Sequence, residues 1–219
     1  MQLLLRKAVN WVYTNDSFVK DWRSKRMLSF LKLVKPPSHA RIVDLGGSPY
    51  IWKLIEHNFD ITLVNLPENS SFVSFDIPPK FRFIKGDVTD ISNLFEDKSF
   101  DVVFSNSTIE HVGDEEKQAS FASEVMRLAN SYWVQTPSIN FPLEPHTGVP
   151  FYWQLPDWWR RHLHDSWRKK LPVWTKSVED TRVLTCLRMR ELFPEAEIYV
   201  ERLLFLEKSY SFYKAYSSD

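Results

Sequence analysis

The sequence is poor in cysteine and glycine. Cys186 is the one cysteine among 219 residues, so no disulfide can form within the chain. A single thiol in an amphipathic segment is more often a buried side chain than a reactive group, and it fits a reducing, cytoplasmic setting. Two of the five glycines, Gly46 and Gly47, are adjacent. Such a pair indicates a point where the backbone turns sharply.

The sequence also lacks an excess of charge of one sign and a long apolar run. Lysine plus arginine and aspartate plus glutamate both number 28, so a general electrostatic attraction to nucleic acid is not expected. The first residues, MQLLLRKAVNWVY, are too short an apolar patch for a membrane span and lack a cleavage site. We therefore expect a cytoplasmic protein without a nucleic-acid partner, and a helix at its start.

Apolar residues are abundant enough, at 43%, to form the core of one domain. Residues 1–37 are predicted to form a helical extension of two helices, and residues 38–219 the main domain. Strands alternate with helices in this domain, which predicts an α/β fold with a mainly parallel sheet and one antiparallel strand. Strands are expected at 41–45, 60–66, 81–85, 100–105 and 132–135, helices at 48–57, 114–129 and 180–193, and a final strand pair around a turn near residues 207–208.

The segment VDLGGSPY, residues 43–50, carries the clearest chemical signal. It places Asp44 at the end of a strand, then Gly46 and Gly47, and then Ser48 at the start of a helix, which is how a nucleotide-type site is built. The third glycine of the dinucleotide fingerprint G-x-G-x-x-G is missing. The turn is therefore a poor phosphate cradle, but it leaves room for the amino-acid end of a ligand.

Further landmarks follow in order: GDV at 86–88, FDVVFSNSTIEHV at 100–112, LRMRELFP at 187–194 and LEKSYSFYKAY at 206–216. Together with VDLGGSPY they resemble the class I S-adenosylmethionine-dependent methyltransferases, particularly the type 11 group, over about residues 38 to 216. The resemblance implies a Rossmann-like, seven-stranded sheet with helices on both faces. It also implies S-adenosylmethionine as cofactor and methyl transfer to an oxygen or nitrogen of a small-molecule, sugar or lipid-linked acceptor.

The resemblance also implies which residues contact the cofactor. Two departures from the family pattern bear on this site. Asn65 stands where an acidic residue usually holds the ribose, and an amide lacks the charge-assisted strength of a carboxylate, so Glu68 could substitute for it. Ser48 replaces the second glycine of the usual motif. The residues implied are Asp44, Gly46, Gly47 and Ser48 at the methionine part, Asn65 and Leu66 at the ribose, Asp87 and Val88 at the adenine edge, and Asn106 below the sulfonium.

An insertion at residues 137–176 follows the fifth predicted strand and should overhang the site, because ligands bind at the carboxyl ends of parallel strands. Glu144 and His146 flank Pro145 in a rigid turn. His146 is our first hypothesis for the base that removes a proton from the acceptor, with Glu144 orienting it, and His111 is the second. The residue spacing predicts neither a metal site nor a nucleophilic triad.

The insertion contains a cluster of tryptophan and basic residues with three interpretations. Trp158, Trp159, Arg160 and Arg161 could offer aromatic faces and cations to an anionic or sugar-bearing acceptor. Alternatively, the tryptophans pack on the sheet and the basic face is solvated. In a third interpretation, this face and the N-terminal helix make weak contact with an anionic membrane surface.

Two other functions stay open for the chain as a whole. A non-catalytic protein with the same fold, acting as a binding partner or scaffold, is compatible with Asn65. A nicotinamide-dependent oxidoreductase is disfavoured by the missing third glycine and by the lack of a Tyr-x-x-x-Lys pair after the fifth strand.

Overall fold

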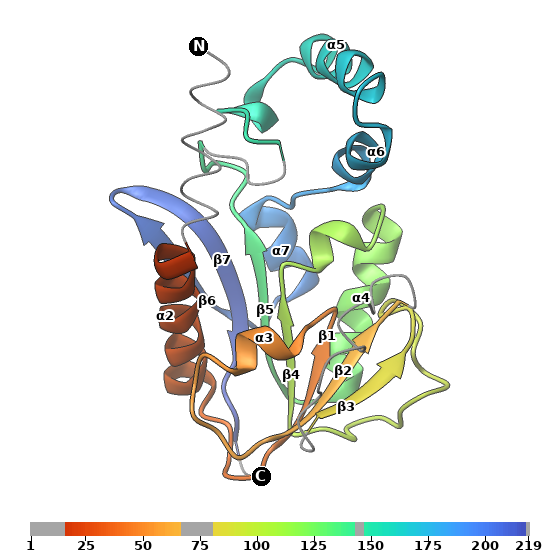
Figure 1. Cartoon of the computed structure of the whole chain (residues 1–219). Coiled ribbons are helices and arrows are strands. Elements are labelled where there is room, and N and C mark those ends of the chain that lie inside the picture. Colours follow the sequence, from red (N-terminus) through yellow and green to blue (C-terminus); the bar gives the residue numbers. More distant parts are fainter. Residues whose placement is uncertain (1–15, 67–80, 143–146, 218–219) are drawn as a thin grey trace.

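The computed structural model of the chain describes residues 16–66, 81–142 and 147–217. Seven strands form one sheet in the order β3-β2-β1-β4-β5-β7-β6 (Figure 1). The strands β1 to β5 are parallel to their neighbours, and β7 alone runs antiparallel to those on both of its sides. This architecture confirms the predicted fold. The strands are β1 (Arg41–Leu45), β2 (Asp60–Asn65), β3 (Phe81–Lys85), β4 (Val102–Asn106), β5 (Ser131–Pro137), β6 (Glu197–Leu203) and β7 (Leu206–Lys214).

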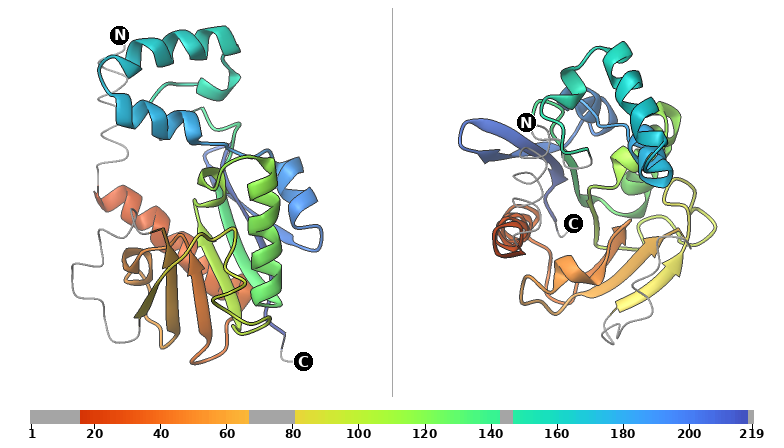
Figure 2. Two further views of the ribbon diagram at one scale, coloured as in Figure 1. Left: turned by 90° about the vertical axis from the view of Figure 1, so that its right-hand side faces the viewer. Right: turned by 45° about the horizontal axis from the view of Figure 1, so that its top comes forward.

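Helices α2 (Asp16–Val34) and α3 (Pro49–Trp52) cover one face of the sheet (Figure 2, left). Met27, Phe30 and Val34 recur at helical spacing on α2 and are fully buried, as expected for the apolar stripe of a helix that packs on a sheet. The ring of Phe30 lies edge-on to that of Phe104 on β4, with 5.1 Å between the centroids. The described helix of the N-terminal extension therefore shares the core of the main domain. The other predicted N-terminal helix lies outside the described residues.

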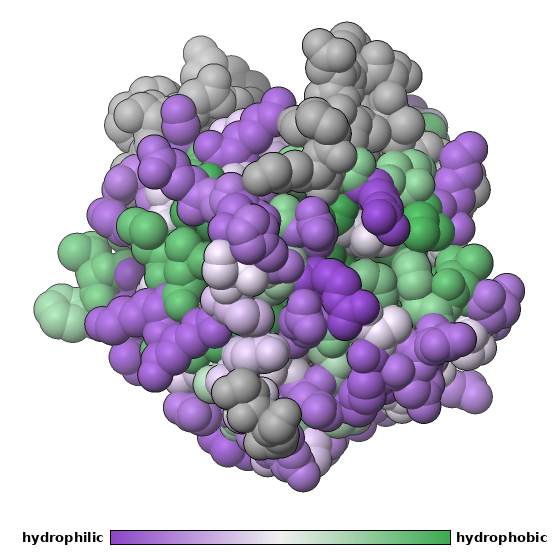
Figure 3. Space-filling view, turned by 90° about the horizontal axis from the view of Figure 1, so that it is seen from below, coloured by the Kyte–Doolittle hydropathy of each residue, from purple (hydrophilic) through white to green (hydrophobic). Residues whose placement is uncertain are grey.

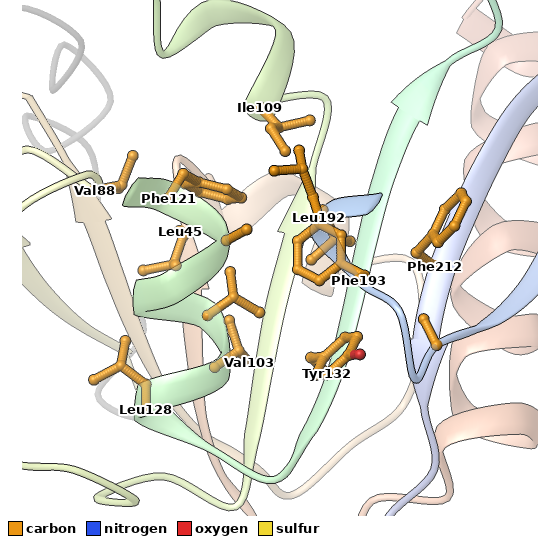
Figure 4. Packing of buried hydrophobic residues seen from close by; sticks show 14 of the residues in the cluster. Leu45, Val88, Val103, Ile109, Phe121, Leu128, Tyr132, Leu192, Phe193 and Phe212 are labelled. Carbon is orange, nitrogen blue, oxygen red and sulfur yellow. The ribbon is translucent and has the colours of Figure 1, made fainter. Parts of the chain in front are cut away.

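Helices α4 (Glu115–Leu128) and α7 (Cys186–Leu192) cover the opposite face. Asp114 caps α4 by accepting a hydrogen bond from the backbone N–H of Lys117 at 3.0 Å, which is the predicted start of this helix. Figure 4 shows Phe121 of α4 and Phe193, just after α7, within the buried cluster that also contains Val103 and Tyr132. Both faces of the central strands are thus buried, which explains their continuous apolar sequence.

The insertion after β5 is more ordered than its irregular sequence suggests. It contains the short helix η4 (Tyr152–Gln154) and an exposed pair of helices, α5 (Asp157–Arg168) and α6 (Pro172–Asp180). Figure 2 shows this pair beyond the sheet, on the side of the carboxyl ends of β1 to β5. No helix in the described part of the chain is both long and apolar enough to cross a membrane.

Three predicted boundaries are wrong. The helix expected at 48–57 ends at Trp52, because the next residues form tighter turns, with Ile55 N–H donating to the Trp52 carbonyl. The helix expected at 180–193 is shorter, because residues 181–185 are not helical and Thr185 caps α7 at Cys186. The last turn lies at residues 204–205 instead of 207–208. Lys208 is part of β7, where its ammonium forms an ion pair with Glu201 of β6.

Candidate active site

The glycine turn after β1 needs both of its glycines. Gly46 has a φ of +78°, a conformation that L side chains rarely adopt, and a Cβ there would lie 2.4 Å from the Thr108 side chain. A Cβ on Gly47 would lie 1.8 Å from the Asp44 carboxylate. The Gly46 N–H donates to the Val64 carbonyl at 2.8 Å. The backbone therefore passes directly over the end of β1 and leaves open space above it.

Asp44, the acidic residue of this turn, is completely buried. Its Oδ2 accepts a hydrogen bond from the Trp52 indole N–H at 2.8 Å, whereas its Oδ1 has no partner among the described residues. Burial raises the pKa of Asp44 to about 7, and the hydrogen bond from Trp52 only partly opposes this effect. A buried carboxylate with an unused oxygen is well placed to bind a cationic group of a ligand.

A pocket of about 160 Å³ opens over this turn at the carboxyl ends of β1 and β4. It is smaller than the roughly 300 Å³ or more of typical small-molecule sites, so it would hold one end of a ligand. Five predicted site residues meet here, together with three that the sequence did not indicate. The lining residues are Arg23, Asp44, Gly46, Gly47, Ser48, Tyr50, Ile51 and Asn106.

Arg26 of α2 fixes the floor of this region, and sequence reasoning missed it. Its guanidinium donates to Asn106 Oδ1 at 2.7 Å and to Gln135 Oε1 at 3.1 Å, and it pairs with Glu201 Oε2 at 2.5 Å. Arg26 is nearly inaccessible to solvent. The sequence did contain a signal for it, because Arg26 precedes Phe30 by four residues and so lies on the same apolar stripe of the helix. An arginine on an apolar stripe implies a buried acidic partner.

Asn65, the unusual residue at the end of β2, stabilises the glycine turn. Its amide N–H donates to the carbonyl of Gly47 at 2.6 Å, and the side chain is buried. A carboxylate could not donate this bond, which gives a structural reason for an amide here. Ser48 is the N-cap residue of α3, but its hydroxyl makes no capping hydrogen bond. Leu66 is exposed beyond the end of β2.

Residues 47–131 match a family model described as a methyltransferase domain. This match begins at Gly47 in the glycine turn and ends at the first residue of β5, so it includes β2, β3 and β4 but not β1. This match agrees with the predicted resemblance to the type 11 methyltransferases. The buried Asp44 carboxylate and the open glycine turn would fit the methionine end of S-adenosylmethionine.

The chain is also similar to curated proteins and, in its fold, to solved structures. Two uncharacterised proteins from two strains of Mycobacterium tuberculosis are each 27% identical over 143 residues, which is 62% of this chain and 46% of theirs. The chain thus spans less than half the length of these curated relatives.

A putative S-adenosylmethionine-dependent methyltransferase of Methanococcus maripaludis shares the fold, with a TM-score of 0.54, 12% identity and coverage of 100% of this chain and 94% of that one. Phosphoethanolamine N-methyltransferase 2 of Haemonchus contortus, solved with S-adenosylmethionine, gives a TM-score of 0.58, 12% identity and coverage of 89% and 53%.

Asp87 and Val88 do not line the 160 Å³ pocket. Asp87 Oδ1 accepts hydrogen bonds from the backbone N–H and hydroxyl of Thr89, at 3.0 and 2.7 Å. Partial burial tends to raise the pKa of Asp87, but these bonds and the charge of Lys117 outweigh it, so the pKa lies below its usual value. Val88 is part of the hydrophobic core. The Asp87 carboxylate is half exposed and remains ionised.

Of the three residues predicted for acid–base chemistry, one is described. His111 ends the short helix η3 (Ile109–His111), a few residues beyond β4, and is exposed. Its Nδ1 lies 3.4 Å from the hydroxyl of Thr181. Glu144 and His146 lie outside the described residues. Within the described ranges, no group of three or more histidine, cysteine or acidic side chains is arranged to hold a metal ion.

The tryptophans of α5 do not pack on the sheet, so that interpretation is wrong. The rings of Trp158 and Trp159 stack on each other with centroids 5.7 Å apart, and they are 65% and 47% exposed. Arg160 pairs with Asp157 at the start of the helix, and Arg161 is exposed. Trp158, Trp159 and Arg161 are therefore accessible to a ligand or a surface, whereas Arg160 is held by Asp157 and lies over the ring of Trp153.

Contacts within the insertion, instead of contacts with the sheet, hold α5 and α6 together. The Tyr152 hydroxyl lies 2.5 Å from His164 Nε2, and Glu179 Oε1 lies 3.2 Å from His164 Nδ1. Burial lowers the pKa of His164, although the charge of Glu179 opposes this. The rings of Trp167 and Trp174 pack edge-on at 5.1 Å. The helix pair thus has a small core of its own.

A larger cavity, of about 440 Å³, lies at the opposite edge of the sheet. It is formed by the first residues of β1, β2 and β3, including Arg41, Asp60 and Arg82, and by the segment from Leu94 to Phe100. Figure 3 views the molecule from this end, where hydrophilic and hydrophobic residues are interspersed. Ligands of open α/β sheets bind at the carboxyl ends of the strands, so the smaller pocket is the better candidate site.

Proposed function

We propose that this chain transfers a methyl group from S-adenosylmethionine to an oxygen or nitrogen of a small-molecule, sugar or lipid-linked acceptor. The observation that carries this proposal is the pocket over the glycine turn, where the buried Asp44 carboxylate has an oxygen without a partner among the described residues. When bound, the cofactor supplies a methyl group on a positively charged sulfur. The contribution of the chain is to hold acceptor and methyl group in line, which needs no covalent enzyme intermediate.

Named residues would hold the cofactor as follows. Asp44 and the glycine turn bind its methionine end, and Asn106, held by Arg26, lies beneath the reacting sulfur. Asp87 accepts a hydrogen bond at the adenine edge with its ionised carboxylate. Asn65 and Leu66 lie at the end of β2, where the ribose is expected. The roles of Asp87, Asn65 and Leu66 rest on the family resemblance.

Calorimetry with S-adenosylmethionine and with NADH tests the cofactor assignment. We expect binding of S-adenosylmethionine and its demethylated product without added metal, and Asp87→Ala should weaken both by roughly 1 to 3 kcal/mol. Asp90→Ala, an exposed acidic residue in the same turn, is the matched control and should bind normally. No binding by the wild type, or tight binding of NADH, would contradict the proposed function.

A hydroxyl acceptor needs a base, because its oxygen is a poor nucleophile until the proton leaves. His146, oriented by Glu144, remains the first hypothesis and His111 the second, since histidine titrates near neutral pH. Replacing the base by alanine should lower turnover about 100-fold or more while cofactor affinity stays unchanged. Normal turnover in both His146→Ala and His111→Ala would exclude these histidines, or would indicate an amine acceptor that needs no base.

Exposed apolar side chains favour the lipid-linked acceptor among the three classes. Leu204 and Phe205 form the β6–β7 turn and are 83% and 95% exposed. Because β7 pairs antiparallel to β5 and begins beyond its end, this turn projects from the carboxyl edge of the sheet, as the exposed Trp158 does from the insertion. Apolar and tryptophan side chains beside basic residues are typical of membrane-surface contact.

Sedimentation with phosphatidylglycerol vesicles tests this acceptor class. The wild type should sediment with the vesicles, and Phe205→Ser should reduce the bound fraction several-fold. Ser217→Ala, an exposed polar position far from the turn in sequence, should change nothing. A wild-type protein that stays in the supernatant at low salt would favour a water-soluble acceptor instead.

A further inference from the structure

The wall of the cofactor pocket nearest α2 is formed by Arg23. Its guanidinium lies over the ring of Tyr50, with 5.6 Å from Cζ to the ring centroid. Within residues 16–66, 81–142 and 147–217, Arg23 makes no ion pair and no hydrogen bond. A cation that lines a pocket and has no anionic partner among the described residues can bind an anionic group of a ligand.

Asp44 places an opposite charge in the same pocket. It is fully buried, and its Oδ1 has no partner in the part of the chain that the structure describes. The pocket is thus lined by a carboxylate on the sheet side and a guanidinium on the helix side. A ligand with an ammonium and a carboxylate on neighbouring atoms complements both, and the α-amino acid end of S-adenosylmethionine is such a group.

We propose that Arg23 binds the α-carboxylate of the cofactor while Asp44 binds its ammonium, so that the N-terminal helix completes the cofactor site. This inference rests on the proposed function. Arg23 lies outside residues 47–131, which match the methyltransferase family model. The proposed carboxylate-binding residue therefore comes from the helix that precedes the matched segment.

The position of Arg23 is fixed by its neighbour one turn later. Arg26 is three residues further along α2 and lies on the same side of the helix. Its contacts with Asn106 and Glu201 anchor the helix to the sheet. Lys208 adds a second anchor, because its ammonium lies 3.8 Å from the ring centroid of Trp22 and 3.3 Å from Glu201. The helix is thus held rigidly enough to present Arg23 to a ligand.

Calorimetry with two ligands that differ only in the carboxylate tests this role. S-adenosylmethionine carries the group and decarboxylated S-adenosylmethionine lacks it, whereas both keep the amine and the sulfonium. Arg23→Ala should weaken the binding of S-adenosylmethionine about 10- to 100-fold, as expected for the loss of a charge-assisted hydrogen bond. Its affinity for the decarboxylated ligand should stay within about two-fold of that of the wild type.

Lys25→Ala is the matched control, since it removes one positive charge from the same helix. Lys25 pairs with Asp21 at 2.8 Å on an exposed side of α2, so both affinities should be unchanged. If Arg23→Ala weakens the binding of both ligands equally, or of neither, the inference is overturned. The cofactor assignment still stands in that case, provided that the wild type binds S-adenosylmethionine. Failure of the wild type to bind S-adenosylmethionine would refute the proposed function itself. Thermal unfolding of each variant checks that the fold is retained.

Discussion

Replacing Asp44 by asparagine should stabilise the ligand-free protein and weaken cofactor binding. Burial raises the pKa of Asp44 from 3.8 to about 7. A group whose folded-state pKa is raised contributes stability that is fully present below its unfolded pKa and is lost as the pH rises through the folded value. The ionised form of Asp44 therefore destabilises the folded protein above about pH 7. Asparagine stays neutral and still offers Trp52 an oxygen as hydrogen-bond acceptor.

The size of the effect follows from the shift in pKa. Each unit corresponds to about 1.4 kcal/mol, so a shift of about three units is worth roughly 4 kcal/mol. Asp44→Asn should therefore raise the free energy of unfolding by up to about 4 kcal/mol near pH 8. Near pH 5 the folded wild type has taken up the proton, and the gain should fall to about 1.5 kcal/mol. Urea unfolding at both pH values measures this difference.

Cofactor binding provides an independent measurement of the same group. An ammonium beside Asp44 favours the ionised carboxylate, so binding at about pH 6 should release a proton, which calorimetry in buffers of different ionisation enthalpy detects. Asp44→Asn should bind more weakly and release none. Asp90→Asn is the matched control in an exposed turn. If Asp44→Asn is no more stable than the wild type near pH 8, the assigned pKa and its cause are wrong.

Three further predictions concern other parts of the molecule. Arg26→Met should lower the free energy of unfolding by about 3 kcal/mol, measured in urea, because the buried Glu201 carboxylate would lose its closest charged partner. A loss under about 1 kcal/mol would show that Lys208 alone compensates the charge of Glu201. Asn65→Asp should weaken cofactor binding about 10-fold by calorimetry, since a carboxylate cannot donate to the glycine turn, and tighter binding would contradict this. The double variant Arg160→Ala, Arg161→Ala should raise the acceptor KM and leave the cofactor affinity unchanged. If both the acceptor KM and the cofactor affinity are impaired equally, α5 has a structural role instead of an acceptor-binding one.

The β6–β7 turn shows where local patterns mislead. Charged residues normally favour turns over strand interiors, so the Glu207–Lys208 pair predicted the turn. Lys208 instead lies in β7, paired with Glu201 and packed on Trp22. Its partners come from another strand and from a helix far away in the sequence. The true turn carries exposed apolar residues, which only the register of the two strands reveals.

The sequence by itself determined the parallel sheet and the glycine turn with Asp44, Gly46 and Gly47 at its carboxyl edge, and the family resemblance added Asn106. These features follow from alternating strand and helix periodicity and from the rule that parallel strands end at one edge. Tertiary structure alone decided that α2 packs beside the turn and brings Arg23 to the pocket. That placement depends on buried contacts between residues about 80 to 175 positions apart, such as Arg26 with Asn106 and Glu201. No local pattern encodes such partners, because each is chosen only when the chain packs.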